Sequence, residues 1–258
     1  MSNIIKGPDH PLVNDRFYNW HDSGGWYFGS GDPEFWKFSD TLLKPGGSLL
    51  DIGVGAGRAS LFFALNGMKV TGIDNDPIKV QQANELASQM APALPFELKA
   101  HQLDALNEPL PEGPYDTVLL SHLVHIDSKQ KAFDIFDKAL EVLKPGGSIW
   151  VRGAGKESYS YWDLSYQALT GRDPNIRMLD QDVIVHPCDC SGEYRVEPTL
   201  FFDPLDLVNY FSQSGCQIIH SQTIPTEDKM NIMYGEDYNP EYPMLVGGMV
   251  SILAQKKT

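Results

Sequence analysis

The chain has 258 residues, of which 42% are hydrophobic, and its formal net charge at pH 7 is −14. This length suits one α/β domain with additions, and the acidic balance disfavours a nucleic-acid partner because the 20 Lys and Arg residues are scattered. The sequence lacks an apolar run of about 18 residues, a signal-peptide pattern and enough cysteines for a disulfide framework, so we expect a cytoplasmic protein without a membrane segment.

Residues 1–44 precede the first expected strand and are predicted to form an N-terminal cap or lid. Six aromatic residues lie between positions 17 and 28, and four glycines lie between positions 24 and 31. Aromatic rings supply contact area, while glycines leave the backbone adaptable. A lid over a ligand site and a plain cap packed on the domain both remain open. Asp32-Pro33 is expected to start a helix that continues to Leu42.

The most informative stretch is Leu49–Arg58, which reads LLDIGVGAGR. An apolar run is followed by glycines at positions 53, 55 and 57, and an apolar helix is expected from Ala59. Glycine permits a sharp turn and close approach of a ligand, and a helix N-terminus offers unpaired N–H groups. The spacing is G-x-G-x-G, so it does not match the dinucleotide-binding fingerprint G-x-G-x-x-G, and no phosphate-loop Lys follows.

A second strand is predicted over Met68–Ile73, and it ends in Asp74. In a doubly wound fold, a carboxylate at this place accepts hydrogen bonds from ribose hydroxyls. Asp76-Pro77 follows, with the Asp suited to cap a helix and the Pro suited to its first turn. A nucleotide-like ligand at the glycine turn is therefore expected.

Short apolar segments alternate with helical segments from residue 48 to residue 152. This alternation predicts a parallel sheet covered by helices on both faces. The carboxyl ends of its strands would meet at one edge, where ligands bind. The polar residues expected at that edge include Asp74, Asp104 and Ser121.

Residues 153–198 interrupt the alternation and are predicted to be an insertion. An aromatic helix is expected near its start, with Tyr159, Tyr161, Trp162 and Tyr166. A helix from Asp203 to Ser214, a strand over 216–223 and a last strand over 244–255 should follow, with a polar loop at 225–243.

These stretches together resemble class I S-adenosylmethionine (SAM)-dependent methyltransferases. Leu49–Arg58 and Val70–Asp74 look like the first two motifs of that family, Tyr115–Ser121 like its fourth strand, and Leu143–Val151 like its fifth. The resemblance implies an α/β fold, doubly wound, with a mostly parallel seven-stranded sheet and an antiparallel last strand. The methyltransferase domain would span 45–258, with substrate-side insertions at about 153–198 and 225–243.

The resemblance also implies a set of residues that bind SAM. The glycines would cradle the cofactor, Asp74 would hold the ribose, and the loop after the third strand would contact the adenine. Asp51 would serve the SAM amino group, although backbone N–H groups could equally satisfy its carboxylate. The implied cofactor-binding residues are Asp51, Gly53, Gly55, Gly57, Asp74, Asn75, Asp104, Ala105 and Ser121.

His122 and His125 are the candidate catalytic bases, because imidazole titrates near neutral pH and both follow the fourth strand. A histidine satisfied near a helix start is the plainer alternative for each. Arg16 and Arg58 could each clamp a carboxylate, although surface exposure is the expectation for both. Aromatic faces suit a cation, so the candidate substrate-binding residues are Tyr18, Trp20, Trp26, Tyr159 and Trp162.

We predict no metal site. His186, Cys188 and Cys190 have the spacing H-x-C-x-C, whereas zinc sites usually combine wider spacings and four ligands. Cys216 is the only spare thiol, and no second cluster accompanies these residues.

The expected activity is transfer of the SAM methyl group to an oxygen or nitrogen atom of a small molecule. Two alternatives keep the cofactor site. One is an enzyme that cleaves or cyclises SAM, or transfers its aminocarboxypropyl arm, and the other is a non-catalytic SAM-binding module. The sequence indicates no oligomeric state.

Overall fold

The computed structural model describes residues 38, 41–121, 126–188, 195–224 and 249–258. The described residues fall into two compact units. The first contains the residues up to 121, with 137–150 and 255–258, and the second contains 126–136 and 151–254.

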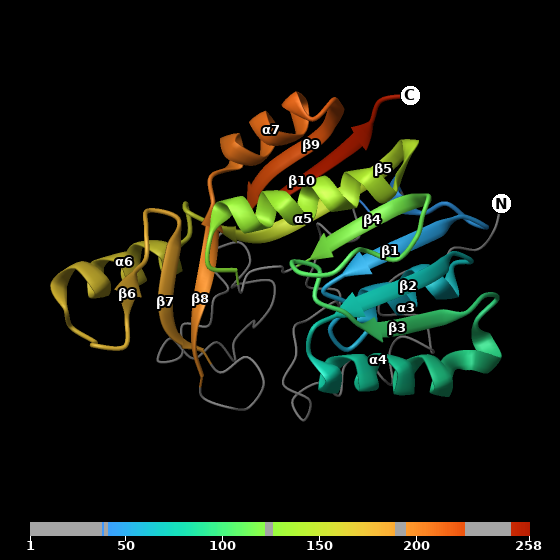
Figure 1. Cartoon of the computed structure of the whole chain (residues 1–258), viewed down its shortest axis with the longest axis horizontal. Coiled ribbons are helices and arrows are strands. Elements are labelled where there is room, and N and C mark those ends of the chain that lie inside the picture. Colours follow the sequence, from blue (N-terminus) through green and yellow to red (C-terminus); the bar gives the residue numbers. More distant parts are fainter. Residues whose placement is uncertain (1–37, 39–40, 122–125, 189–194, 225–248) are drawn as a thin grey trace. The chain divides into compact units, whose positions relative to one another are not determined.

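The first unit is a parallel sheet with the strand order β3-β2-β1-β4-β5 (Figure 1). Parallel pairing joins β1 to β2, β1 to β4 and β2 to β3. Asp51 lies on the central strand, opposite Gly72 on one side and Leu119 on the other. The strands are β1 (Ser48–Ile52), β2 (Lys69–Asp74), β3 (Leu98–Gln102), β4 (Tyr115–Ser121) and the first part of β5 (Leu143–Gly155).

Helices follow the strands as the alternation predicts, and they are α3 (Arg58–Leu65), α4 (Pro77–Met90), η1 (Ala91–Ala93) and α5 (Lys129–Val142). Every residue of α3 after Arg58 is buried, because the helix lies over the sheet rather than at its rim. Asp76 caps α4 by accepting a hydrogen bond from the Ile78 amide, and Pro77 occupies the first turn. The predicted helix start at Asp76-Pro77 is confirmed.

The second unit combines the end of β5 with the segments that follow it. Its further elements are α6 (Tyr159–Thr170), β6 (Arg177–Met178), β7 (Val183–Cys188), β8 (Arg195–Phe202), α7 (Pro204–Gln213), β9 (Cys216–Ile224) and β10 (Met249–Lys256). β6, β7 and β8 form an antiparallel meander, and β8 pairs in parallel with the end of β5 through Ala154 and Phe201. β10 pairs with β5 and β9, and it runs opposite to β9 (Figure 1).

The predicted fold class, a mostly parallel α/β sheet with an antiparallel last strand, is confirmed. The seven predicted strands correspond to β1–β5, β9 and β10. The insertion adds β6, β7 and β8, which the sequence did not indicate, so the described sheet has ten strands. The expected aromatic helix of the insertion is present as α6.

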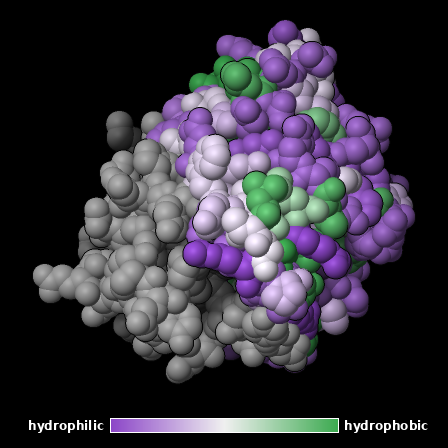
Figure 2. Space-filling model, turned by 90° about the vertical axis from the view of Figure 1, so that its left-hand side faces the viewer, coloured by the Kyte–Doolittle hydropathy of each residue, from purple (hydrophilic) through white to green (hydrophobic). Residues whose placement is uncertain are grey.

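Figure 2 shows a largely hydrophilic face that is interrupted by small groups of hydrophobic residues. Among the described residues, no helix is both long enough and apolar enough to cross a membrane.

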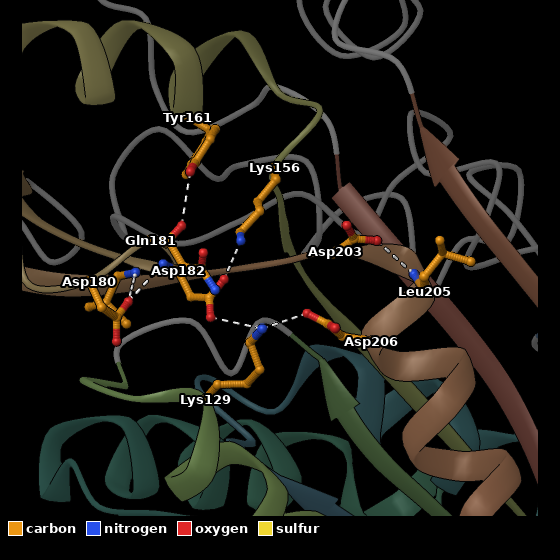
Figure 3. Close-up of polar contacts among 10 residues, drawn as sticks. Lys129, Lys156, Tyr161, Asp180, Gln181, Asp182, Asp203, Leu205 and Asp206 are labelled. Atoms are coloured by element: carbon orange, nitrogen blue, oxygen red, sulfur yellow. Dashed lines mark hydrogen bonds and ion pairs between the residues drawn. The ribbon is translucent and has the colours of Figure 1, made fainter.

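Asp182 links the insertion to the start of α5, which belongs to the second unit, and through Lys129 to α7 (Figure 3). Its side chain is 9% exposed and accepts from Lys129 at the start of α5, at 2.8 Å, and from Lys156 after β5. Lys129 also contacts Asp206 in the first turn of α7, at 2.5 Å. Burial raises the pKa of Asp182, but its hydrogen bonds to the two lysines outweigh that effect and hold the pKa below its usual value.

We predict that Asp182→Asn lowers the free energy of unfolding by roughly 3 kcal/mol at pH 7, because it takes the carboxylate away from the partly buried Lys156 and leaves the partly buried Lys129 with Asp206 alone. A carboxylate whose pKa is lowered on folding stabilises the protein above its unfolded-state pKa of 3.8, and this contribution is lost as the pH falls below that value. Urea denaturation at several pH values measures both effects. The matched control is Asp127→Asn, which breaks an ion pair with Lys131 whose side chains are 48% and 47% exposed. A loss as small as the control's at pH 7 would contradict the assignment.

Candidate cofactor site

The glycine turn between β1 and α3 is held against β2 by backbone hydrogen bonds. The amides of Gly53 and Val54 both donate to the Ile73 carbonyl, at 2.8 and 2.9 Å, and the Gly57 amide donates to Val54. Gly53, Gly55 and Gly57 all have positive φ values, of 80°, 52° and 81°. L-amino acids with side chains rarely adopt this backbone region, so the turn explains why glycine occupies all three positions.

Two of these glycines differ in what surrounds them. A Cβ atom on Gly57 would lie 3.0 Å from the Cβ of Ala83 in α4, so glycine there allows the turn and the helix to pack closely. A Cβ atom on Gly55 would meet no atom of the described residues within 4 Å. The turn is therefore closed by protein at Gly57 and open at Gly55, where a ligand can approach the backbone.

Asp74, at the end of β2, fixes the open part of the turn. Its Oδ2 accepts from the Gly55 amide at 2.9 Å, and its Oδ1 accepts from the Asp76 amide at 3.0 Å. Each carboxylate oxygen has a second acceptor site, so the group can still take hydrogen bonds from two hydroxyls. The residue expected to bind ribose is thus also the one that shapes the glycine turn.

Asp51 is buried inside β1 and is 2% exposed. Its Oδ2 accepts from the Ser60 hydroxyl of α3 at 2.8 Å. Burial raises the pKa of Asp51 to about 7, with the nearby charge of Asp74 adding to the rise and the Ser60 hydrogen bond opposing it. In the structure, this carboxylate is hydrogen-bonded to a side-chain hydroxyl of α3. The alternative drawn from the sequence was hydrogen bonding to backbone N–H groups.

Asp104 organises the loop that follows β3. Its Oδ1 accepts from the Leu106 amide at 2.9 Å, and its Oδ2 accepts from the Asn107 side chain at 2.7 Å. The Asn107 hydrogen bond is the main cause that lowers the pKa of Asp104. The Leu103 amide donates to the Asp74 carbonyl at 2.9 Å, which places the start of this loop beside the end of β2. Both sequence-based readings of Asp104, as an adenine acceptor and as a loop carboxylate, remain compatible with this geometry.

The other expected cofactor residues lie on the same unit. Ser121 ends β4 and is 8% exposed, and its Oγ has no hydrogen-bond partner among the described residues. A buried hydroxyl of this kind is usually satisfied, so it fits a place where a ligand supplies the missing partner. Asn75 is exposed between β2 and α4, and Ala105 lies partly buried in the loop after β3.

The residues present fit a nucleoside. Gly55 leaves room for it, Asp74 retains acceptor sites for hydroxyls, and Ser121 holds an unused hydroxyl. The hydrogen bonds from Gly55 to Asp74 and from Leu103 to Asp74 bring the turn and the loop after β3 together. This grouping at the carboxyl ends of the strands is the one that the sequence predicted.

Arg58 corrects one expectation. The sequence suggested an exposed side chain, but Arg58 is only partly exposed, and burial lowers its pKa to about 10. The cause is its place at the first position of α3, a helix whose following residues are all buried. No pattern in the sequence distinguishes this arginine from a surface one.

Several expected site residues lie outside the described residues, and they are Arg16, Tyr18, Trp20, Trp26, His122 and His125. Residues 1–37, 39 and 40 of the expected N-terminal cap or lid lie outside them too. Tyr159 begins α6, and Trp162 follows on the same helix with 66% of its surface exposed. Trp162, Tyr166 and Leu169 are spaced by four and three residues and are all exposed, so they share one open face of α6.

The opposite side of α6 is packed. Tyr161, Leu164 and Ala168 contact a buried cluster in the second unit that comprises Ala154, Ile176, Ile184 and Phe201. This packing fixes the helix and leaves the other face exposed, where the Arg172 guanidinium lies over the Tyr166 ring at 5.3 Å.

Both ring nitrogens of His186 lie within hydrogen-bond distance of protein atoms. Its side chain is buried, with Nε2 2.9 Å from the Thr199 hydroxyl and Nδ1 2.8 Å from the Pro187 carbonyl. Within the described ranges, no group of three or more His, Cys, Asp or Glu residues could hold a metal ion. Cys190 lies outside those ranges.

Comparison with known families places this site in a class. Residues 49–147, which contain the glycine turn, Asp74 and Asp104, match the model of the family described as "Methyltransferase domain". This part of the chain is similar to methyltransferase domains, and the predicted resemblance is confirmed.

The curated relatives match less than half of the chain. A phosphoethanolamine N-methyltransferase from Triticum aestivum is 33% identical over 132 residues, which are 48% of this chain and 25% of the relative. An S-adenosyl-L-methionine-dependent Diels-Alderase from Talaromyces variabilis is 33% identical over 114 residues, which are 43% of this chain and 38% of the relative. The chain therefore spans less than half the length of these two relatives.

Solved structures extend the likeness to most of the fold. A SAM-dependent methyltransferase from Methanosarcina mazei superposes with a TM-score of 0.62 at 20% sequence identity. The match covers 85% of this chain and 97% of that protein. At this identity the likeness concerns the fold.

We predict that substitutions of Gly55 and Gly57 affect different properties, with Gly57 more important for stability and Gly55 more important for ligand binding. Gly55→Ala and Gly57→Ala each place a Cβ at positive φ, which costs roughly 1–2 kcal/mol. Gly57→Ala should destabilise further, because of the contact with Ala83. Gly55→Ala should instead weaken binding of S-adenosylhomocysteine (SAH), because its methyl group fills the open position. Urea denaturation and calorimetry measure the two effects. Equal losses of stability, or unchanged SAH affinity in Gly55→Ala, would contradict this view of the turn.

Proposed function

We propose that this protein transfers the methyl group of SAM to an oxygen or nitrogen atom of a small molecule. One observation carries the proposal: Asp74 is held by backbone hydrogen bonds beside the open position at Gly55, within a region similar to methyltransferase domains. A carboxylate already fixed in place accepts ribose hydroxyls without first losing conformational freedom.

The described residues divide the work of holding the cofactor. Asp74 accepts from the ribose hydroxyls, and Gly53, Gly55 and Gly57 let the cofactor lie against the backbone. Asn75, Asp104 and Ala105 contact the adenine, and Asp51 and Ser121 serve the amino-acid end. Arg58, at the start of α3, contacts the carboxylate at that end.

Asp51 responds to the charge of the cofactor. Its pKa of about 7 leaves it partly protonated at neutral pH. A bound ammonium group nearby would favour the carboxylate and lower that pKa. Binding should therefore release a proton from Asp51.

When bound, SAM supplies a methyl group on a positively charged sulfur. The protein contributes positioning, which alone can account for much of the acceleration. If the acceptor is a hydroxyl, His122 or His125 takes its proton, and a neutral amine needs no base. The acceptor is held by Tyr18, Trp20, Trp26, Tyr159 and Trp162.

The nature of the acceptor follows from charge and from the relatives. A net charge of −14 works against nucleic-acid substrates, and the Triticum aestivum relative is named for a small acceptor molecule. The exposed aromatic face of α6 suits a small organic molecule. With three cysteines in the chain, the cytoplasm is our proposed location.

A second function is favoured by one comparison. The Talaromyces variabilis relative is named as a SAM-dependent Diels-Alderase, so a similar domain is found in a protein whose named reaction is a cyclisation. In that case the cofactor site would be kept, and SAM would not be consumed.

We predict that incubation of the protein with methyl-deuterated SAM and a small-molecule extract yields SAH and an acceptor that carries the labelled methyl group. Mass spectrometry detects both products, and heat-denatured protein serves as the control. Labelled methylthioadenosine in place of SAH would mean cleavage of SAM or transfer of its other arm. Tight SAM binding without any turnover would favour the cyclase or the non-catalytic binding module.

A further inference from the structure

Lys138 of α5 reaches the loop after β3 and binds three of its backbone carbonyls. The Nζ atom lies 2.8 Å from the Ala105 oxygen, 2.8 Å from the Leu106 oxygen and 3.1 Å from the Glu108 oxygen. An ammonium group has three donors, so these contacts use all of them.

The loop that Lys138 holds is already ordered from within. The Asp104 carbonyl accepts from the amides of Asn107 and Glu108, at 3.1 and 2.9 Å. The Asp104 amide donates to the Glu108 side chain at 2.9 Å. These bonds define the local turn, but they do not determine how the turn is placed on the rest of the unit.

Contacts at the two ends of this loop fix its position on the rest of the unit. At its start, the Leu103 amide donates to the carbonyl of Asp74, the residue that also holds Gly55. Over residues 105–108, Lys138 ties the loop to α5. The loop is thereby clamped between the strand that carries the ribose-binding carboxylate and a helix of the same unit.

We propose that Lys138 is a positioning residue for recognition of the adenine base. This inference rests on the proposed function, in which Asp104 and Ala105 contact that base. Lys138 touches neither the base nor the reacting atoms, and it acts by fixing the Ala105 backbone and the Asp104 side chain. Its positive charge also contributes to the lowered pKa of Asp104, which keeps that side chain an acceptor.

An ordinary capping role would have a different consequence. If Lys138 only satisfied loop carbonyls, water could replace it at these partly exposed positions, and the base preference of the site would not change. If Lys138 sets the position of the loop, its loss should reduce discrimination between bases that differ at the 6-position of the purine.

The test compares SAH with S-inosylhomocysteine, which carries oxygen in place of the 6-amino group, by calorimetry. Lys138→Met removes the ammonium and keeps the aliphatic stem, and Lys138→Arg retains the charge. The matched control is Lys144→Met, which removes another lysine of the same unit that binds Asp116 at 2.8 Å. Hydrogen exchange over residues 103–109 without ligand gives a second measurement that is independent of binding.

We expect Lys138→Met to bind SAH roughly tenfold more weakly and to lose most of the preference for SAH over the inosine analogue. Loop exchange should be faster, Lys138→Arg should recover part of the preference, and Lys144→Met should match the wild type.

A wild-type base preference in Lys138→Met, or an equal loss in Lys144→Met, would overturn the inference alone. Failure of the wild-type protein to bind SAH would overturn the proposed function and this inference together. If Lys138→Met does not fold, Lys138→Arg provides the test. Its guanidinium has a different geometry, so the preference for SAH over the inosine analogue should fall by a smaller but measurable amount. An unchanged preference in Lys138→Arg would then overturn the inference.

Discussion

The carboxylate of Asp74 is the constraint on which the candidate site depends. One oxygen receives the Gly55 amide and the other receives the Asp76 amide, so a single side chain joins the glycine turn after β1 to the start of α4. The carbonyl of the same residue receives Leu103 from the loop after β3. Three connections therefore meet at the end of β2. A ligand that binds Asp74 would find the turn and the loop already in place, which is the advantage of a preorganised site.

Most of the first unit could be predicted from the sequence because its signals are local. The strand Tyr115–Ser121 has the apolar centre Val118–Leu120, and it was predicted over the residues that the structure gives it. Asp76 and Pro77 mark a helix start through capping and a fixed φ angle. The spacing of Gly53, Gly55 and Gly57 predicted a turn whose positive φ angles the structure confirms.

The remainder depends on contacts between distant residues. The meander β6–β8 is held by strand pairing between residues such as Val183 and Leu200, which no local sequence pattern predicts. Lys138 resembles any helical surface lysine, because its partners are backbone carbonyls about thirty positions earlier. The burial of Arg58 depends on how α3 packs in the folded protein. The hydrogen bond from Ser60 to Asp51 depends on how α3 packs against β1.

The central claim is that Asp74 both shapes the glycine turn and binds the cofactor, and calorimetry of SAH binding to Asp74→Asn tests it most directly. Asparagine keeps the size of the side chain, but it replaces one of the two acceptor oxygens by an NH₂ donor, so one backbone N–H group and one ribose hydroxyl lose their acceptor. We predict that the wild type binds SAH and that the variant loses at least about 3 kcal/mol of binding free energy, the equivalent of two hydrogen bonds to a charged group. Equal SAH affinity in the two proteins would contradict the account.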